Sequence, residues 1–385
     1  MEKVIEEYQR KFARFFGAES AFAFWKGRVA LYALLRALDI DQGDEVILPG
    51  YTCVMNVNPI KYVGARPVYV DIEPDTFNMN VNLLEEKITN KTKVIITQHT
   101  YGYPCEMDTI MKIAQSSGIC VIEDCCLALG SKYKDRMVGT FGRAGYFSSQ
   151  WNKSYTTGLG GIVITNDCEL AGRIESIMTK EICPPSDWEV FMLQMQLIFY
   201  RLFIYPRTVA LAQNLFRYLT TKGAVIGSSS ASEYEPVKAD GFFKAISAMQ
   251  ARSGIRQLNK IEKNIAHRRE MTQLYDELLI SKGFKPSKDS RDSAEPVLVR
   301  YPVRITEKDK ALAQAAKAGI ELGSWFECPL HPIETPLASY DYELGMCPEA
   351  EKAACEAVNL PLHPRVSEKT VKRSIDFITS FTQAG

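Results

Sequence analysis

The stretch that decides the fold is GYFSSQWNKSYTTGLGGIVITND, residues 145–167. It holds parts of two apolar runs, Ala144–Ser148 and Gly161–Thr165, on either side of a loop rich in Gly, Ser and Thr. Short apolar runs bounded by such residues are typical of buried strands. The lysine of the loop, Lys153, is therefore expected to leave the sheet soon after a strand ends.

Four more apolar runs precede this stretch, and helical patterns separate them. The runs are Glu45–Pro49, 66–72, 93–97 and Cys120–Asp124, and the helical patterns include 27–40, 81–88 and Met107–Ser117. Strands that are apolar throughout and alternate with helices indicate a mostly parallel sheet covered on both faces.

The C-terminal third predicts a smaller α+β part. A long helical pattern over 243–280 is followed by strands, at 297–305 and 321–326, and by helices, at Lys308–Ala318 and 368–381. We expect a large α/β domain over 1–240, with an apolar helical insertion at about 187–230. The long linking helix and the small domain occupy 241–385.

Composition narrows the classes of function. Lys and Arg together equal Asp and Glu, so the net charge is zero and nothing favours a nucleic-acid partner. The ten cysteines contain no C-x-x-C pair, which predicts reduced thiols and no metal site. The charged N-terminal segment has no signal-peptide pattern, so we expect a cytoplasmic protein.

Three features carry chemistry at the strand ends, where open parallel sheets bind ligands. Asp124 closes one strand, Lys153 follows another, and a helix begins at Gly27, Arg28 and Val29. Each alone has an ordinary explanation as a turn residue, a surface lysine or a common helix start. Together they predict a site for pyridoxal 5′-phosphate (PLP). The amine condenses with its aldehyde, the acid faces its ring nitrogen and the helix start binds its phosphate.

In addition, the sequence resembles the DegT/DnrJ/EryC1/StrS family of sugar aminotransferases along nearly its whole length. The matching segments, in order, are GDEVILPGYT (43–52), GARPVYVDIEPDTFNMN (64–80), VIEDCCLALGSKY (121–133), residues 145–167, QARSGIRQL (250–258), GIELGSWFECPLHP (319–332) and LPLHP (360–364). The resemblance implies PLP-dependent transferase fold type I. It has a large domain with a mostly parallel seven-stranded sheet and a small C-terminal α+β domain.

The resemblance also implies roles for individual residues. Lys153 would be the Schiff-base lysine, Asp124 the partner of the pyridinium nitrogen, and Ser148 a ligand of the phosphate. The backbone at Gly27, Arg28 and Val29 would hold the other side of the phosphate. The Arg28 guanidinium either pairs with the phosphate or points to solvent, and both readings stay open.

Two further positions are assigned by the resemblance. His331 lies where family members bring substrate-contacting residues, although a structural role is the alternative. Cys53 stands where an aromatic residue would cover the cofactor ring.

Other family positions are replaced as well. Leu127 replaces a glutamine, Leu159 a glutamate and Gln150 a histidine, and GFFKAIS (241–247) lacks an Asn-Tyr-Arg motif. These changes leave cofactor binding intact and predict an unusual substrate pocket.

The insertion contains VFMLQMQLIFYRLFIY, residues 190–205, which is apolar around most of a helix and ends at Pro206. Three readings stay open. The helix packs in a dimer interface or on the large domain, it dips into a membrane face through residues 190–219, or it lines a pocket for an apolar substrate.

The expected function is transfer of an amino group, from glutamate, to a keto-sugar that is linked to a nucleotide, by a homodimer. Three alternatives remain open. The first is an enzyme acting on a lipid-linked or other apolar carbonyl compound. The second is a dehydratase, which the retained Lys153 argues against. The third is a regulator that kept the fold without catalysis.

Overall fold

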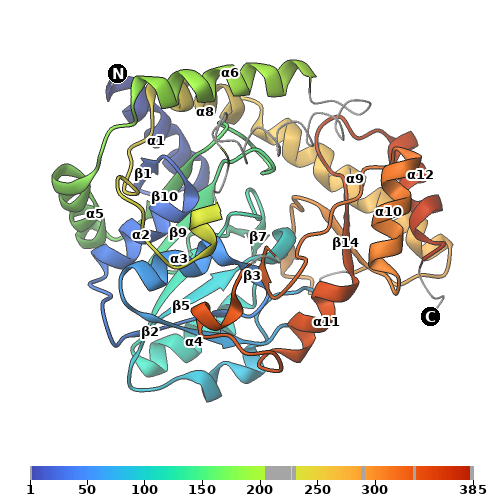
Figure 1. The fold of residues 1–385 in the computed structure, drawn as a ribbon, viewed down its shortest axis with the longest axis horizontal. Helices are drawn as coiled ribbons and strands as arrows, with labels where there is room; N and C mark the ends of the chain where they lie inside the picture. The colour runs from blue at the N-terminus through green and yellow to red at the C-terminus, as the bar shows by residue number, and fades with distance from the viewer. Residues whose placement is uncertain (1, 204–226, 228–230, 288–290, 333–334, 382–385) are drawn as a thin grey trace.

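The computed structural model describes residues 2–203, 227, 231–287, 291–332 and 335–381 (Figure 1). A seven-stranded sheet of order β1-β10-β9-β6-β5-β2-β4 forms the centre of the large domain. In this sheet β10 runs antiparallel to both neighbours, and the other pairs are parallel. The strands are β1 (Ser20–Phe24), β2 (Glu45–Pro49), β4 (Arg66–Val70), β5 (Thr92–Gln98), β6 (Cys120–Asp124), β9 (Ala144–Ser148) and β10 (Gly161–Thr165).

This arrangement confirms the predicted fold class. Every strand of the sheet except β1 matches a predicted run to within two residues at either end. The runs of Val, Ile and Leu are buried on both faces, which is what a sheet between two helical layers requires.

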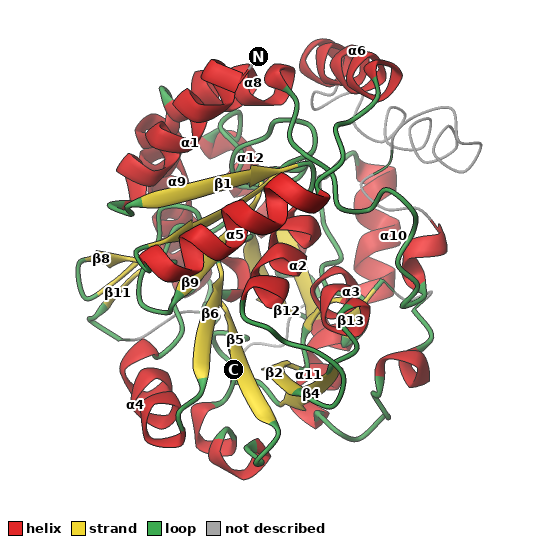
Figure 2. Cartoon of the chain, turned by 90° about the vertical axis from the view of Figure 1, so that its left-hand side faces the viewer, coloured by secondary structure: helices red, strands yellow, loops and turns green. Residues whose placement is uncertain are grey.

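Helices cover both faces of the sheet. The helices of the large domain are α1 (Glu2–Phe16), α2 (Gly27–Ala37), α3 (Val54–Tyr62), α4 (Met107–Ser117) and α5 (Cys168–Glu181). Figure 2 shows α2 and α5 in front of the strands, and all of α2 except Arg36 is buried. On the other face the rings of Phe12 and Phe16 in α1 pack on Phe147, with ring centroids 5.1 and 4.5 Å apart.

The C-terminal part carries its own small sheet, in which β12 (Tyr301–Arg304) pairs antiparallel with β14 (Ala357–Leu360). Four of its helices lie on one side of the molecule (Figure 1): α9 (Ile261–Ser281), α10 (Lys308–Ala318), α11 (Pro348–Glu356) and α12 (Glu368–Ile378). The fifth, α8 (Ala248–Leu258), lies beside α1 of the large domain. The helices at Lys308–Ala318 and 368–381 were predicted, the second with a later end.

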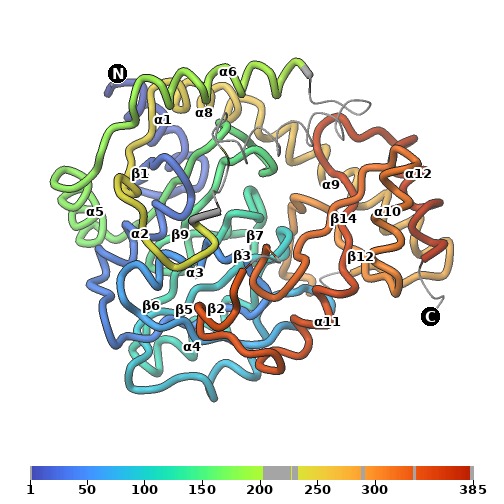
Figure 3. The backbone as a smooth tube through the Cα atoms, viewed as in Figure 1, coloured from blue at the N-terminus to red at the C-terminus, as the bar shows by residue number. Residues whose placement is uncertain are grey.

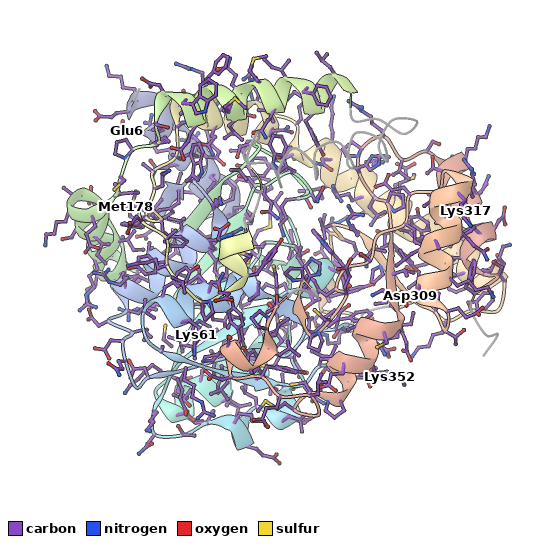
Figure 4. All side chains as sticks on the ribbon, in the orientation of Figure 1. Glu6, Lys61, Met178, Asp309, Lys317 and Lys352 are labelled. Atoms are coloured by element: carbon purple, nitrogen blue, oxygen red, sulfur yellow. The ribbon has the colours of Figure 1, made fainter. Side chains whose placement is uncertain are left out.

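Short pairings join this part to the large domain. β13 (Leu330–His331) pairs parallel with β3 (Thr52–Cys53), and β11 (Ala294–Glu295) pairs with β7 (Lys132–Tyr133), which pairs with β8 (Arg136–Met137). An ion pair adds to them, because Nζ of Lys61, labelled in Figure 4, lies 2.9 Å from Oδ2 of Asp341. Asp341 follows the 3₁₀ turn η5 (Leu337–Tyr340). These contacts tie the C-terminal part to the large domain.

Two helical predictions are wrong. The pattern over 243–280 forms two helices, α8 and α9, because Lys260 leaves the helical conformation between them. A capping box at Ser247, with Gln250, starts α8. Residues 81–88 form two 3₁₀ turns, η1 (Val81–Leu83) and η2 (Glu85–Lys87), instead of one helix.

Two strand predictions need correction as well. Residues 321–326 form no strand: Gly323 pairs with Asn359 in a single antiparallel bridge, and the Trp325 N–H then donates to the Asn359 side chain instead of a backbone carbonyl. The run 297–305 is a strand only in its second half. In its first half, Val297 and Val299 donate backbone bonds to the large domain instead.

Helix α6 (Asp187–Phe203) is the described part of the apolar insertion, and it runs along one outer edge of the molecule (Figure 3). Leu193 and Leu197 are buried against Trp25, Trp151 and Leu159 of the large domain. Residues 204–226 lie outside the described residues, and with them most of the segment considered for membrane contact. Among the residues described, no helix combines the length and the apolar character that crossing a bilayer requires.

Candidate active site

The site forms where three adjacent strands end. Gln98, Asp124 and Ser148 are the last residues of β5, β6 and β9, which lie side by side and parallel. Beyond them is a cavity of about 280 Å³, close to the lower end of the range for small-molecule sites. Its lining includes all but one of the residues predicted for the site: Gly27, Arg28, Cys53, Asp124, Ser148, Lys153 and His331. Val29 is buried in the core behind it.

The Asp124 carboxylate is held in place at the cavity wall. Its Oδ2 accepts a bond of 2.5 Å from Nδ2 of Asn56, and its Oδ1 accepts one of 2.9 Å from the Cys126 N–H. The Tyr146 hydroxyl donates to Oδ1 of Asn56, which turns the amide nitrogen of Asn56 toward the carboxylate. A carboxylate has about four acceptor positions, so Asp124 can accept a further bond from a group in the cavity.

The residue before Asp124 stabilises the same strand end from the other face. The buried Glu123 carboxylate accepts backbone N–H bonds from Gly139, Phe141 and Gly142. His99 lies 3.1 Å from it through Nε2, while Nδ1 of His99 accepts the Cys105 N–H. These bonds fix the end of β6, and with it Asp124.

Lys153 lies in the loop between β9 and β10, and helices hold that loop from outside. The side chain of Gln250 in α8 donates to the Leu159 carbonyl at 2.7 Å, and that of Asn264 in α9 donates to the Ser154 carbonyl at 2.5 Å. Tyr200 of α6 donates to the Trp151 carbonyl at 3.0 Å. Lys153 therefore lies in a loop whose backbone is fixed by hydrogen bonds from three helices.

The start of α2 approaches Ser148 because β1 is parallel to β9 and separated from it only by β10. A Cβ on Gly27 would lie 3.0 Å from Cβ of Ser148, and a Cβ on Gly161 would lie 2.3 Å from the Lys26 carbonyl oxygen. Glycine at both positions lets the helix start, with its free N–H groups, stand beside the end of β9.

Arg28 does not point to solvent, so that reading is wrong. Its side chain is buried, and Nη1 lies 2.6 Å from Oε1 of Glu233. Lys26 also faces Glu233, at 3.4 Å. Burial, together with the charge of Arg28, lowers the pKa of Lys26 to about 8.

The C-terminal part supplies the opposite wall of the cavity. Trp325 lines it, with Nζ of Lys153 5.1 Å from its ring centroid, and Phe326 lies 5.5 Å from the His331 ring, centroid to centroid. His331 pairs with Cys53 across β13 and β3. Burial raises the pKa of the Cys53 thiol, which keeps it neutral.

Several lining residues were not singled out from the sequence. Among them are Lys26, Asn56, Gln98, Tyr234, Trp325 and Phe326. Lys26 could have been predicted from the sequence, since it directly precedes the helix start. Asn56 could not, because its role depends on contact with a residue 68 positions away.

The replaced family positions also face this region. Leu127, Gln150 and Leu159 all line the cavity. Leu159 is fully buried and belongs to the cluster that contains Leu193 and Leu197 of α6. The apolar residue in place of the family's glutamate therefore packs on the insertion.

The residues present fit PLP. The cavity offers a lysine amine, a fixed carboxylate and a helix start flanked by Ser148 and Arg28, which are the donors and acceptors that its aldehyde, ring nitrogen and phosphate require. Together with the sheet order, this arrangement defines a PLP-dependent enzyme of fold type I.

More narrowly, the chain belongs to the DegT/DnrJ/EryC1/StrS aminotransferase family, whose model matches residues 2–195 and 210–379. Aminotransferases of this family use PLP. The predicted family, enzyme class and cofactor are thus confirmed, while the roles of the single site residues stay predictions.

Two GDP-perosamine synthases and one solved structure are similar to this chain. The chain is 48% identical over 169 residues to the GDP-perosamine synthase of Escherichia coli O157:H7, a match that spans 44% of the chain and 46% of that protein. It is 29% identical over 381 residues to the GDP-perosamine synthase of Caulobacter vibrioides, spanning 97% of the chain and 88% of that protein. The fold is similar to that of a DegT/DnrJ/EryC1/StrS aminotransferase from Brucella abortus, with a TM-score of 0.76 and 24% sequence identity. The match covers 98% of this chain and 90% of that one.

Proposed function

We propose that the protein transfers an amino group from glutamate to the keto group of a nucleotide-linked sugar. The observation that carries the proposal is the placement of Lys153 and Asp124 on the wall of one cavity at the strand ends. The match along nearly the whole chain to a GDP-perosamine synthase supports the class of acceptor. All ten cysteines lie among the described residues and none of them forms a disulfide, which suits a reducing compartment such as the cytoplasm.

Within this proposal the side chains have distinct tasks. When bound, PLP supplies an aldehyde carbon that takes up the amino group and a ring that withdraws electrons. Lys153 holds the cofactor through its amine and then moves a proton at the carbon that carries the amino group. Asp124 keeps the ring nitrogen protonated. Ser148, Arg28 and the N–H groups at the start of α2 bind the phosphate.

A spectroscopic titration tests this function. The purified protein with PLP is expected to show a visible absorbance band that bleaches when glutamate is added and returns when 2-oxoglutarate is added. The band returns because glutamate gives its amino group to the cofactor and 2-oxoglutarate takes it back, both in the same cavity. Absence of the band at saturating cofactor would favour a regulator without catalysis, and a band that glutamate leaves unchanged would exclude glutamate as donor.

One observation that favoured an apolar substrate, the apolar residue at position 159, has another explanation. Leu159 is explained by its contacts with α6, so its apolar character does not call for an apolar substrate. The dehydratase alternative is disfavoured because Lys153 is retained at the cavity wall.

We also propose that the protein works as a homodimer, with α6 in the interface. One side of α6 remains exposed along a stripe spaced by three or four residues: Trp188, Phe191, Met195, Ile198 and Leu202. Apolar helical faces of this kind are normally covered. The acidic residues of its first turn, Asp187 and Glu189, disfavour an anionic membrane surface as the cover.

The mass in solution tests the dimer. Light scattering is expected to give twice the 43.3 kDa chain mass, and a Phe191→Glu/Met195→Glu variant is expected to shift toward the monomer, because charge would enter an apolar interface. A matched Glu175→Gln change on α5 should leave the mass unchanged. A monomeric wild type that binds liposomes would assign the stripe to a membrane instead.

A further inference from the structure

Lys26, Arg28 and Glu233 form a cluster of charges at the start of α2. One oxygen of Glu233 lies 2.6 Å from Nη1 of Arg28 and 3.4 Å from Nζ of Lys26. The side chains of Arg28, Glu233 and Lys26 are only 4%, 11% and 19% exposed. Since Lys26 and Arg28 both line the cavity, the carboxylate serves as the counter-ion of two cations that face the cofactor site.

The same place favours a phosphate. The helix start contributes N–H groups and the positive end of its dipole, and Lys26 and Arg28 add two positive charges. A phosphate monoester carries a charge of roughly −1.5 to −2 at neutral pH. A carboxylate kept beside it would raise its free energy by like-charge repulsion. Glu233 and the phosphate therefore compete for the same cations.

We propose that Glu233 is a displaceable counter-ion, whose carboxylate leaves Lys26 and Arg28 when the cofactor phosphate binds between them. Lys26 is then a phosphate-binding residue beside Arg28. This inference rests on the proposed function, since it takes the start of α2 as the phosphate subsite.

The backbone of Glu233 is anchored independently of its carboxylate. Glu233 belongs to the 3₁₀ turn η4 (Ala231–Tyr234), and its carbonyl accepts a buried bond of 2.7 Å from Nδ2 of Asn58. Oδ1 of Asn58 accepts the Tyr340 hydroxyl, also at 2.7 Å. A change in the position of the Glu233 carboxylate thus breaks neither of these bonds.

The exchange also leaves both cations paired. Removing one member of a buried ion pair is unfavourable when its partner stays uncompensated. Here the phosphate takes the place of the carboxylate and forms charge-assisted bonds with both cations. Lys244, the other cation near Lys26, stays paired with Glu189 at 2.5 Å.

The Glu233→Gln variant tests the competition. Its dissociation constants for PLP and for inorganic phosphate, measured by calorimetric titration, are expected to fall about tenfold, because the competing charge is gone. Glu235→Gln removes the same charge from an exposed position two residues away and should leave both constants unchanged. Lys26→Met should raise both constants about tenfold.

Opposite results would overturn the inference. If Glu233→Gln weakens binding or leaves it unchanged, Glu233 orients Arg28 instead of competing with the ligand. If that variant does not fold, Lys26→Met decides, and unchanged constants in it reject Lys26 as a ligand. A wild type that binds neither probe would overturn the proposed function as well, whereas a wild type that binds both confines the failure to Glu233 and Lys26.

Discussion

Replacing Lys153 by alanine is expected to leave a folded protein that binds PLP without covalent attachment and transfers amino groups at least about 10²–10⁴-fold more slowly. The loss has two sources. The amine that holds the cofactor is gone, and so is the group that moves the proton at the reacting carbon. The measurements are the visible absorbance of the bound cofactor and the rate of its bleaching by glutamate.

The structure indicates that this variant changes the chemistry and not the loop. The loop is held through the carbonyls of Trp151, Ser154 and Leu159, so none of these bonds uses the Lys153 side chain. Lys317→Ala, at an exposed position in the C-terminal part (Figure 4), is the matched control and should behave as wild type. An alanine variant with an unchanged spectrum and rate would remove Lys153 from the mechanism.

Much of the large domain follows from the sequence because its strands are buried on both faces. Runs such as Glu45–Pro49 and Gly161–Thr165 cannot lie elsewhere than between two layers. The strand β1, SAFAF, was missed, since its two alanines and partial burial give a weak pattern. It becomes a strand through its pairing with β10.

That missed strand matters for the site. Because β1 lies beside β10, the helix that follows it begins next to Ser148, and the predicted phosphate position is assembled. Sequence patterns gave the candidates on single elements, Asp124, Lys153 and the helix start. They could not give Asn56, Glu233 or Trp325, because each acts on a residue far away in the chain.

The C-terminal part was harder to predict for a related reason. The sequence predicts a strand over residues 321–326, yet the bonds of Asn359 hold them in an irregular path. A side chain that replaces a backbone partner leaves no periodic signal. The same irregular path carries Trp325 to the cavity, so the least predictable segment supplies one wall of the site.

Replacing Asp124 by asparagine is expected to weaken PLP binding about 10–100-fold and to slow amino-group transfer about 10²–10³-fold. Asparagine has nearly the same shape, so the cavity keeps its size. What is lost is the negative charge that keeps the ring nitrogen protonated, and with it the electron withdrawal on which the transfer depends.

The hydrogen bonds that Asp124 accepts show why asparagine at this position also lowers the free energy of unfolding. The Asn56 amide donates to one carboxylate oxygen and the Cys126 N–H donates to the other. An amide at position 124 must turn its NH₂ toward one of these two donors, which leaves a buried donor without an acceptor at a cost of about 1–3 kcal/mol. The melting temperature should therefore fall as well.

The matched control is Asp309→Asn at an exposed position, labelled in Figure 4, which removes the same charge far from the cavity. It should retain wild-type cofactor affinity and rate. An Asp124→Asn variant that equals this control in affinity, spectrum and rate would show that no ring nitrogen meets this carboxylate. Lys153 would then line the cavity without the partner that the proposed chemistry requires.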